Sequence, residues 1–379
     1  MARSIIKLSK QLGARYDGYT QLTRACSSLT EIKRESNVYE RIRPVVAAFL
    51  APIDWAAAYG SGVMPQATLK PPSSDKSKPL TDLLLSTPDV EAFHKVNMQQ
   101  NPEHYPVYAR LMGSRAVAKV SERWGAGIWY VTQVDISGTY VKYGVMSTSS
   151  LEEDLHDWTT FYLSGRLQKP VLTLLPAPFT LQAALNANTR SALSLSLLLL
   201  PSCFTEDQLW EQIARLSYSG DPRMSIPGAE NPEKVRNIVQ GPGARQGFRE
   251  LYGGLLRQKR VRRKGKDGEW EWEGNGEAKF TQPTDMEHLC HLVSTLPKTL
   301  RLALTRHYAS STEKPLTIST WTQPLSDPKF RQVVNRELQK IIHGPALKQS
   351  VKGLFTAGPV KSFWYAWAKF GKWFKGRRS

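Results

Sequence analysis

Residues 53–62 read Ile-Asp-Trp-Ala-Ala-Ala-Tyr-Gly-Ser-Gly, and residues 80–85 read Leu-Thr-Asp-Leu-Leu-Leu. The first stretch predicts a strand (53–59) that ends in a Gly60-Ser61-Gly62 turn, and the second predicts a short buried strand with one charge, Asp82. Such a turn exposes backbone N–H groups and a hydroxyl, which can hold the phosphates of a nucleotide. A carboxylate on the neighbouring strand can hold magnesium against the same phosphates. The two stretches therefore predict a nucleotide site with Asp82 as candidate metal ligand.

Further strands and helices are expected on both sides of this pair. Two strands joined at Ser137-Gly138 are predicted, at 129–135 and 140–146. Helices are predicted at 40–50, 91–100, 151–163, 180–200, 205–216 and 232–239. We therefore expect an α+β fold. A domain with a mixed sheet (31–178) precedes a mainly helical domain (179–345), for which a winged helix is one candidate architecture.

The composition limits the class of protein. The 379 residues predict two domains with appendages, and 41% hydrophobic residues exclude wholesale disorder. The formal net charge of +18 indicates polyanionic partners such as nucleotides, nucleic acid or an anionic membrane. The P-loop and dinucleotide fingerprints are absent, which argues against an ordinary ATPase or dehydrogenase. The three cysteines lie too far apart in sequence for a disulfide framework. No run is apolar enough to span a membrane, so any membrane contact is expected to be peripheral.

Three segments stand out by their basic charge. Residues 1–30 hold five basic residues against one acid and predict a mitochondrial targeting segment, with an ordinary basic arm as the alternative. The insertion 257–280 starts with a run rich in Lys and Arg and predicts a solvated surface segment, with RNA binding as the alternative. The tail 346–379 contains no acid, and its lysines lie opposite a helical aromatic stripe of Phe363, Trp367, Phe370 and Phe374. This tail is expected to bind anionic lipid, with core packing or a nucleic-acid arm as alternatives.

Longer strings resemble a known family. The turn and acid are similar to those of the nucleotidyltransferase superfamily that includes DNA polymerase beta. The chain further resembles the mitochondrial translocator assembly and maintenance family, the mitochondrial-type phosphatidate cytidylyltransferases. Strings that carry the resemblance are 58–63 (Ala-Tyr-Gly-Ser-Gly-Val), His94-x-x-Asn97, Asn101-x-x-His104-Tyr105, Lys142-Tyr143-Gly144-Val145, 162–171 (Tyr-Leu-Ser-Gly-Arg-Leu-Gln-Lys-Pro-Val), 220–224 (Gly-Asp-Pro-Arg-Met) and 356–359 (Thr-Ala-Gly-Pro). The likeness is looser over 250–345, and Phe93 stands where the family usually has tryptophan.

The resemblance implies a reaction and a set of site residues. Phosphatidate would attack the α-phosphorus of CTP, giving CDP-diacylglycerol and pyrophosphate, with Mg²⁺ as cofactor. The implied catalytic residues are Asp82, Asp154 and Lys142, of which the two acids would hold the metal. The implied phosphate-binding residues are Tyr59, Gly60, Ser61, Gly62, Arg166, Lys169, Arg223 and Lys234. The alternative for the charged residues is an ordinary salt bridge or surface position.

His94 and His104 are expected to be structural, because a phosphate monoester is already ionised near neutral pH and needs no strong base. The expected partners are CTP, phosphatidate and anionic inner-membrane lipids bound by the tail, with no nucleic acid. The resemblance also implies a peripheral position on the matrix side of the mitochondrial inner membrane, feeding cardiolipin and phosphatidylglycerol synthesis. Two other functions stay open: a nucleotidyltransferase for RNA or protein, and a non-enzymatic factor for inner-membrane assembly.

Overall fold

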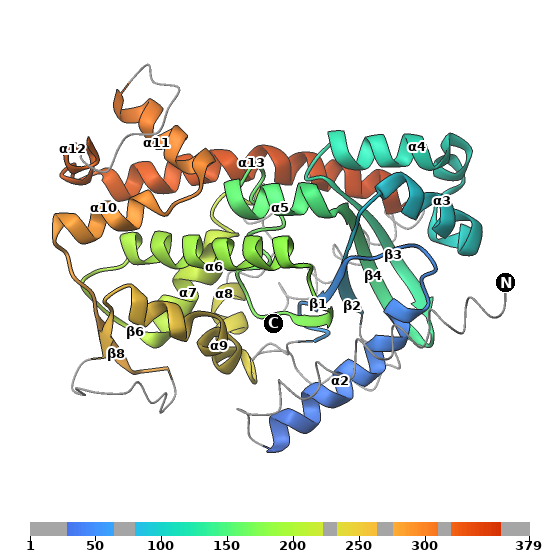
Figure 1. The fold of residues 1–379 in the computed structure, drawn as a ribbon, viewed down its shortest axis with the longest axis horizontal. Helices are drawn as coiled ribbons and strands as arrows, with labels where there is room; N and C mark the ends of the chain where they lie inside the picture. The colour runs from blue at the N-terminus through green and yellow to red at the C-terminus, as the bar shows by residue number, and fades with distance from the viewer. Residues whose placement is uncertain (1–28, 64–79, 223–232, 264–275, 310–319, 358–379) are drawn as a thin grey trace, which may run out of the picture.

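The computed structural model describes residues 29–63, 80–222, 233–263, 276–309 and 320–357 (Figure 1). The first elements are α2 (Leu29–Ala47), β1 (Trp55–Tyr59), β2 (Thr81–Thr87), α3 (Val90–Gln100), η2 (Pro102–His104), α4 (Val107–Arg123), β3 (Ile128–Ile136), β4 (Thr139–Ser147), α5 (Thr148–Asp157) and β5 (Leu172–Leu175). They are followed by α6 (Phe179–Leu199), β6 (Cys203–Thr205), α7 (Glu206–Leu216), α8 (Lys234–Val239), α9 (Ala244–Gln258), β7 (Arg262–Arg263), β8 (Lys279–Thr281), α10 (Met286–Ser294), α11 (Lys298–Ala309), α12 (Thr322–Leu325) and α13 (Phe330–Ala357). The chain is therefore a mixed α+β protein, as predicted.

The central sheet has five strands in the order β3-β4-β2-β1-β5. β2 and β4 pair in parallel, whereas the other neighbouring strands are antiparallel. Because successive side chains of a strand point to opposite faces, the sheet serves two cores. Leu83 and Val145 belong to the core that α2, α3 and α4 cover. Leu84 and Met146 belong to the core that α5 and α6 cover, and Asp82 lies on this second face because it is two residues from Leu84.

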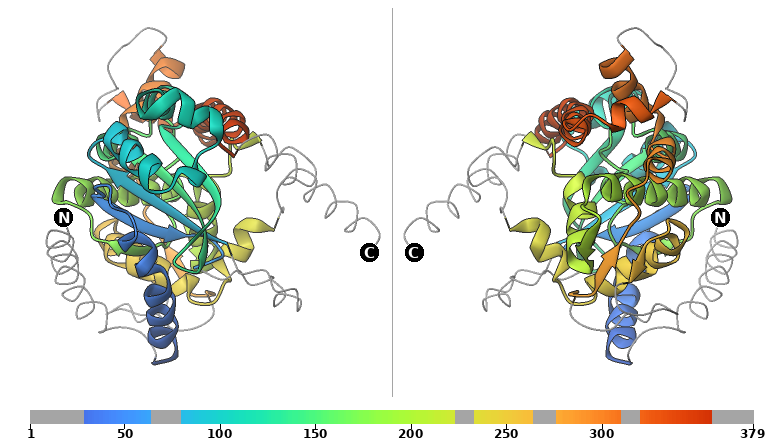
Figure 2. Two further views of the ribbon diagram at one scale, coloured as in Figure 1. Left: turned by 90° about the vertical axis from the view of Figure 1, so that its right-hand side faces the viewer. Right: turned by 90° about the vertical axis from the view of Figure 1, so that its left-hand side faces the viewer.

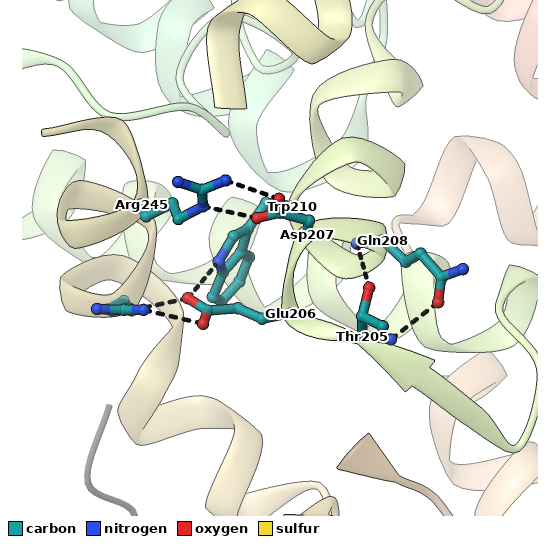
Figure 3. A network of polar contacts seen from close by, with 7 residues as sticks. Thr205, Glu206, Asp207, Gln208, Trp210 and Arg245 are labelled. Atoms are coloured by element: carbon teal, nitrogen blue, oxygen red, sulfur yellow. Dashed lines mark hydrogen bonds and ion pairs between the residues drawn. The ribbon is translucent and has the colours of Figure 1, made fainter. Parts of the chain in front are cut away.

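The helical part has a separate core, to which α6, α7, α9, α10, α11 and α13 contribute. A capping box begins α7, and two ion pairs beside it join α7 to α9 (Figure 3). The carboxylate of Glu206 accepts hydrogen bonds of 2.7 and 2.9 Å from the Arg249 guanidinium. The carboxylate of Asp207 accepts two of 2.7 Å from Arg245. These four side chains fix the packing of α9 against α7. The small sheet β6-β8-β7 lies beside this network.

The long helix α13 runs along the molecule and contacts both parts (Figures 1 and 2). Its first half packs in the core of the helical part, and its second half reaches the edge of the five-stranded sheet. There the Gln349 side chain accepts a hydrogen bond from the Ala126 amide (3.1 Å) and donates one to the Ile128 carbonyl (3.4 Å). The buried Lys352 ammonium donates to main-chain carbonyls at the end of α4. The predicted domain boundary at 345/346 therefore falls inside one helix.

The predicted strands around the Gly-Ser turn and the hairpin of β3 and β4 are confirmed. The helix predicted at 151–163 was wrong in its second half: α5 ends at Asp157, where Trp158 adopts a left-handed conformation (φ 54°). The helix predicted at 40–50 extends further back and ends at Ala47. Outside the described residues lie the aromatic stripe of the tail, residues 1–28 of the targeting segment and residues 264–275, which are half of the insertion 257–280. Within the described ranges, no helix combines the length and the hydropathy that a membrane crossing requires.

Candidate active site

Three polar side chains form a row across neighbouring strands of the central sheet. Tyr59 on β1 is the register partner of Asp82 on β2, and Asp82 is the register partner of Lys142 on β4. The Asp82 carboxylate lies 3.6 Å from the Lys142 ammonium, and their side chains are 28% and 32% exposed. Burial acts to lower the pKa of Lys142, but Tyr59 and Asp82 outweigh it and raise that pKa. Lys142 is therefore protonated at neutral pH, and its ammonium lies beside a solvent-accessible carboxylate.

The glycine turn lies directly against Asp82. Gly60 has a φ of +77°, and the Val63 amide donates to the Gly60 carbonyl over 3.1 Å, which closes the turn. A Cβ on Gly60 would stand 3.3 Å from the Asp82 carboxylate, and a Cβ on Gly62 would stand 2.6 Å from the Leu80 carbonyl. The close approach of the turn to the strand thus requires both glycines. It leaves backbone N–H groups and the exposed Ser61 near one carboxylate, the pairing that the sequence predicts.

Tyr130, a buried tyrosine that the sequence patterns did not single out, lies beside Lys142 on the same face of the sheet. Tyr130 on β3 lies with its ring centroid 4.6 Å from the Lys142 ammonium. Its ring occupies the space over Gly144, where a Cβ would stand 2.7 Å from the Tyr130 ring. A glycine inside a strand indicates such a close approach, so Gly144 was the available signal.

The loop after α5 carries two partly buried cations. The Arg166 guanidinium stacks 3.7 Å from the centroid of the Tyr162 ring and donates to the Tyr162 carbonyl. The Lys169 ammonium donates to the Gly165 carbonyl and to the Ser217 hydroxyl (2.8 Å). Among the described residues, no carboxylate lies within ion-pair distance of Arg166 or Lys169. Within the described part of the chain, both cations therefore contact neutral groups.

Like charges gather at this loop. The Tyr218 ring lies between two ammonium groups, with Lys169 at 5.5 Å and Lys234, the first residue of α8, at 5.4 Å. Burial, together with the charges of Arg166 and Lys234, lowers the pKa of Lys169 to about 7. The electrostatic field of this loop favours an anionic ligand, since an anion would relieve the repulsion among the cations. Arg166 and Lys142 also influence each other, so the loop and the strand row form one electrostatic region.

Asp154 lies in a different environment from Asp82. Its buried carboxylate accepts hydrogen bonds at both oxygens from the loop that follows α5: from the amides of Thr160 (2.7 Å), Phe161 (2.9 Å), Leu163 (3.2 Å) and Ser164 (3.0 Å) and from the hydroxyls of Thr159 (3.3 Å), Thr160 (2.8 Å) and Ser164 (3.0 Å). These contacts occupy the lone pairs that a metal would need. This geometry favours a structural carboxylate that fixes the loop carrying Arg166 and Lys169.

The two histidines lie on the opposite face of the sheet. The His94 ring contacts the Tyr105 hydroxyl over 2.8 Å, and the His104 ring contacts the Tyr143 hydroxyl over 2.8 Å. The Asn97 side-chain amide donates to both hydroxyls. Burial lowers the pKa of His94 to about 3, so its ring is neutral at physiological pH. The network favours the structural interpretation of both residues.

The described residues contain no cluster of three or more His, Cys, Asp or Glu side chains with metal-binding geometry. Magnesium usually binds through one or two carboxylates plus substrate phosphates, so a single accessible acid beside a turn with exposed backbone N–H groups fits this ion. Asp82 meets that condition. Arg223 lies outside the described residues.

Comparison with known proteins identifies related sequences. The family model described as "Phosphatidate cytidylyltransferase, mitochondrial" matches residues 42–372. The chain belongs to this family. A phosphatidate cytidylyltransferase from Bos taurus is 37% identical over 337 residues, covering 88% of this chain and 94% of the relative. The Schizosaccharomyces pombe relative is 36% identical, covering 90% and 85%, and the Caenorhabditis elegans relative is 31% identical, covering 86% and 96%. The phosphatidate cytidylyltransferase match includes both strands of the turn, the loop after α5 and α13.

Proposed function

We propose that this chain is a magnesium-dependent phosphatidate cytidylyltransferase, which converts CTP and phosphatidate to CDP-diacylglycerol and pyrophosphate. The observation that carries the proposal is one accessible acid, Asp82, which lies against a glycine turn and beside Lys142. In the same electrostatic region, Arg166 and Lys169 have no carboxylate partner among the described residues. Two polyanionic substrates need that charge distribution. The family membership supplies the identity of the substrates.

In the proposed reaction, an oxygen of the phosphatidate phosphate attacks the α-phosphorus of CTP. A new phosphorus–oxygen bond forms, and the bond from the α-phosphorus to the bridging oxygen breaks, so that its electron pair leaves with pyrophosphate. The attacking phosphate monoester is largely ionised at neutral pH, so no side chain has to remove a proton. This agrees with the neutral, distant His94. The contribution of the protein is positioning and charge stabilisation.

Within this proposal, the backbone of Gly60–Gly62 and the Ser61 hydroxyl cradle the CTP phosphates, and Asp82 holds the metal. A bound Mg²⁺ would neutralise negative charge that develops on the phosphate oxygens. Lys142 and the cations of the α5 loop stabilise the remaining charge, and Asp154 holds that loop in place.

The finer assignments belong to the same proposal. The sheet with its turn and acid is a nucleotidyltransferase domain, and the helical part with β6-β8-β7 is of winged-helix type. Residues 1–30 direct the protein to mitochondria, and the tail 346–379 attaches it peripherally to the matrix side of the inner membrane. Relatives carry the word mitochondrial in their names, which supports this localisation.

A direct assay tests the proposal. Purified protein is incubated with Mg²⁺, radiolabelled CTP and phosphatidate-containing liposomes, and we expect labelled CDP-diacylglycerol that requires both Mg²⁺ and phosphatidate. CTP binding without labelled lipid would favour an acceptor such as RNA. Absence of CTP binding would favour the non-enzymatic assembly factor.

A further inference from the structure

Exposed apolar side chains gather on two helices far from each other in sequence. The described residues expose nine large apolar side chains, and six of them lie on α4 and on the second half of α13. They are Val107, Leu111 and Met112 on α4 and Leu347, Val351 and Phe355 on α13, which we call the α4–α13 surface. Leu111 is 83% exposed and Phe355 is 59% exposed. Such clustering on a folded protein marks an interaction surface.

The two helices form this surface together. The Tyr108 hydroxyl on α4 donates to the Phe355 carbonyl on α13, and the Trp124 ring lies 5.8 Å from the Phe355 ring. Leu111 and Met112 follow Tyr108 by three and four residues, so they share its side of the helix. The views in Figures 1 and 2 agree that α4 lies beside the second half of α13. The Tyr108–Phe355 contact therefore places the apolar turn of α4 beside the end of α13.

A kink delimits the apolar part of α4. Gly113 has non-helical backbone angles (φ 80°, ψ 167°) inside the helix. The turn before it carries Val107, Leu111 and Met112, and nothing lies within 4 Å of a Cβ placed on Gly113. The kink thus ends a short turn with three exposed apolar side chains.

The charges around the surface are almost all basic. α4 contains Arg110, Arg115, Lys119 and Arg123 against one acid, Glu122, and all five are exposed. α13 contains no acid after Glu337, and Lys348 is exposed beside Leu347. Glu103 is a further exposed acid near the start of α4. Apolar side chains flanked by Lys and Arg are the pattern of a helix in the interface of an anionic bilayer.

We propose that the α4–α13 surface lies in the interface of an anionic lipid bilayer. The occupant follows from the charge: a basic, apolar surface complements a negatively charged lipid headgroup layer above a hydrocarbon core. The inference rests on the proposed function in one respect, that the substrate is itself a lipid. It goes beyond the tail 346–379, because half of the contact comes from α4, more than 200 residues earlier in the chain.

The test is vesicle binding of the full chain. The variant Leu111→Ser/Met112→Ser is compared with Leu50→Ser, a residue that is 61% exposed and belongs to neither helix. With phosphatidylcholine vesicles that contain phosphatidylglycerol, we expect the partition coefficient of the α4 variant to fall roughly tenfold and that of the control to stay unchanged. Arg115→Glu/Lys119→Glu is expected to weaken binding to these vesicles but not to vesicles of phosphatidylcholine alone.

Two results would overturn the inference. The first is equal vesicle binding by the α4 variant and the Leu50→Ser control. The second is unchanged vesicle binding with a loss of self-association measured by light scattering, which would assign the surface to a second copy of the chain. Turnover of a soluble short-chain phosphatidate is measured in parallel and should be the same in all variants. Lack of turnover by the wild type would count against the proposed function alone, since vesicle binding needs no catalysis.

Discussion

Two pairs of basic side chains in this protein have different partners. Arg245 and Arg249 on α9 each donate two hydrogen bonds to a carboxylate of α7. Arg166 and Lys169 in the loop after α5 are also partly buried, but they contact carbonyls, a hydroxyl and aromatic rings. The first pair is neutralised within the fold and stabilises helix packing. The second pair has no such carboxylate among the described residues, which is useful at a site for anionic substrates and costs stability without one.

The largest expected effect comes from Asp82, the accessible acid beside the Lys142 ammonium. Asp82→Asn should lower kcat roughly a thousandfold, since several kcal/mol of charge stabilisation depend on the carboxylate. The melting temperature should change little, because the side chain is accessible to solvent. The assay is CDP-diacylglycerol formation from labelled CTP, and Glu153→Gln, an exposed acid on α5, is the control. Full activity in Asp82→Asn would remove Asp82 from the metal site.

The next effect concerns Arg245 and Arg249, which are neutralised by carboxylates of α7. Arg249→Met should lower the free energy of unfolding by about 3 kcal/mol, because Glu206 would be left buried without its partner. Arg245→Met should cost about 1 kcal/mol, since Asp207 is partly accessible to water. Urea denaturation measures both. Restored stability in Glu206→Met/Arg249→Met would show that the cost comes from the unpaired charge, and an equally unstable double variant would contradict that explanation.

The third prediction concerns Lys169, whose removal should affect turnover more than stability. Lys169→Met should leave the free energy of unfolding unchanged or higher, because it removes a cation that its neighbours repel. The same variant should lower kcat/KM at least about tenfold, since a charge-assisted hydrogen bond to phosphate is worth roughly 1.5–3 kcal/mol. A loss of stability with unchanged turnover would instead make Lys169 a structural residue.

The last prediction concerns the pH dependence of that difference. The pKa of Lys169 is lowered to about 7 in the folded protein, whereas an unfolded lysine has a pKa of about 10.4. Above pH 7 the unfolded chain therefore binds more protons at this position, and unfolding becomes less favourable as the pH rises. Relative to Lys169→Met, the wild type should gain no more than about 1.4 kcal/mol per pH unit above pH 7. A difference independent of pH would contradict the lowered pKa.

Local signals predicted the elements that local sequence determines. The apolar runs of β1 and β2, the Gly60–Gly62 turn and the position of Asp82 between them follow from strand and turn patterns. The end of α5 did not follow from such patterns, because apolar residues continue at helical spacing to Leu163. The structure ends the helix at Asp157, where the carboxylate of Asp154 instead binds the amides of the next loop.

Local sequence patterns did not predict the long-range contacts. The position of Tyr130 over Lys142 depends on the register of the hairpin, which shifts at a bulge between Val131 and Val134. The packing of the α5 loop against the end of α7, where Lys169 donates to Ser217, is a contact between segments 48 positions apart. The contact of α13 with the sheet joins residues more than 220 positions apart, which no local pattern encodes.

That last contact sets an order of events during synthesis. β3 is an edge strand, and the Gln349 side chain binds the backbone at its start across 223 positions of the chain. At roughly 5–20 residues per second, a ribosome needs on the order of ten to fifty seconds to make the intervening segment. During this interval the nascent sheet has an uncovered edge, which is the state most prone to pairing with other chains. A chaperone that holds the nascent chain until α13 emerges would therefore have its greatest effect on yield in this interval.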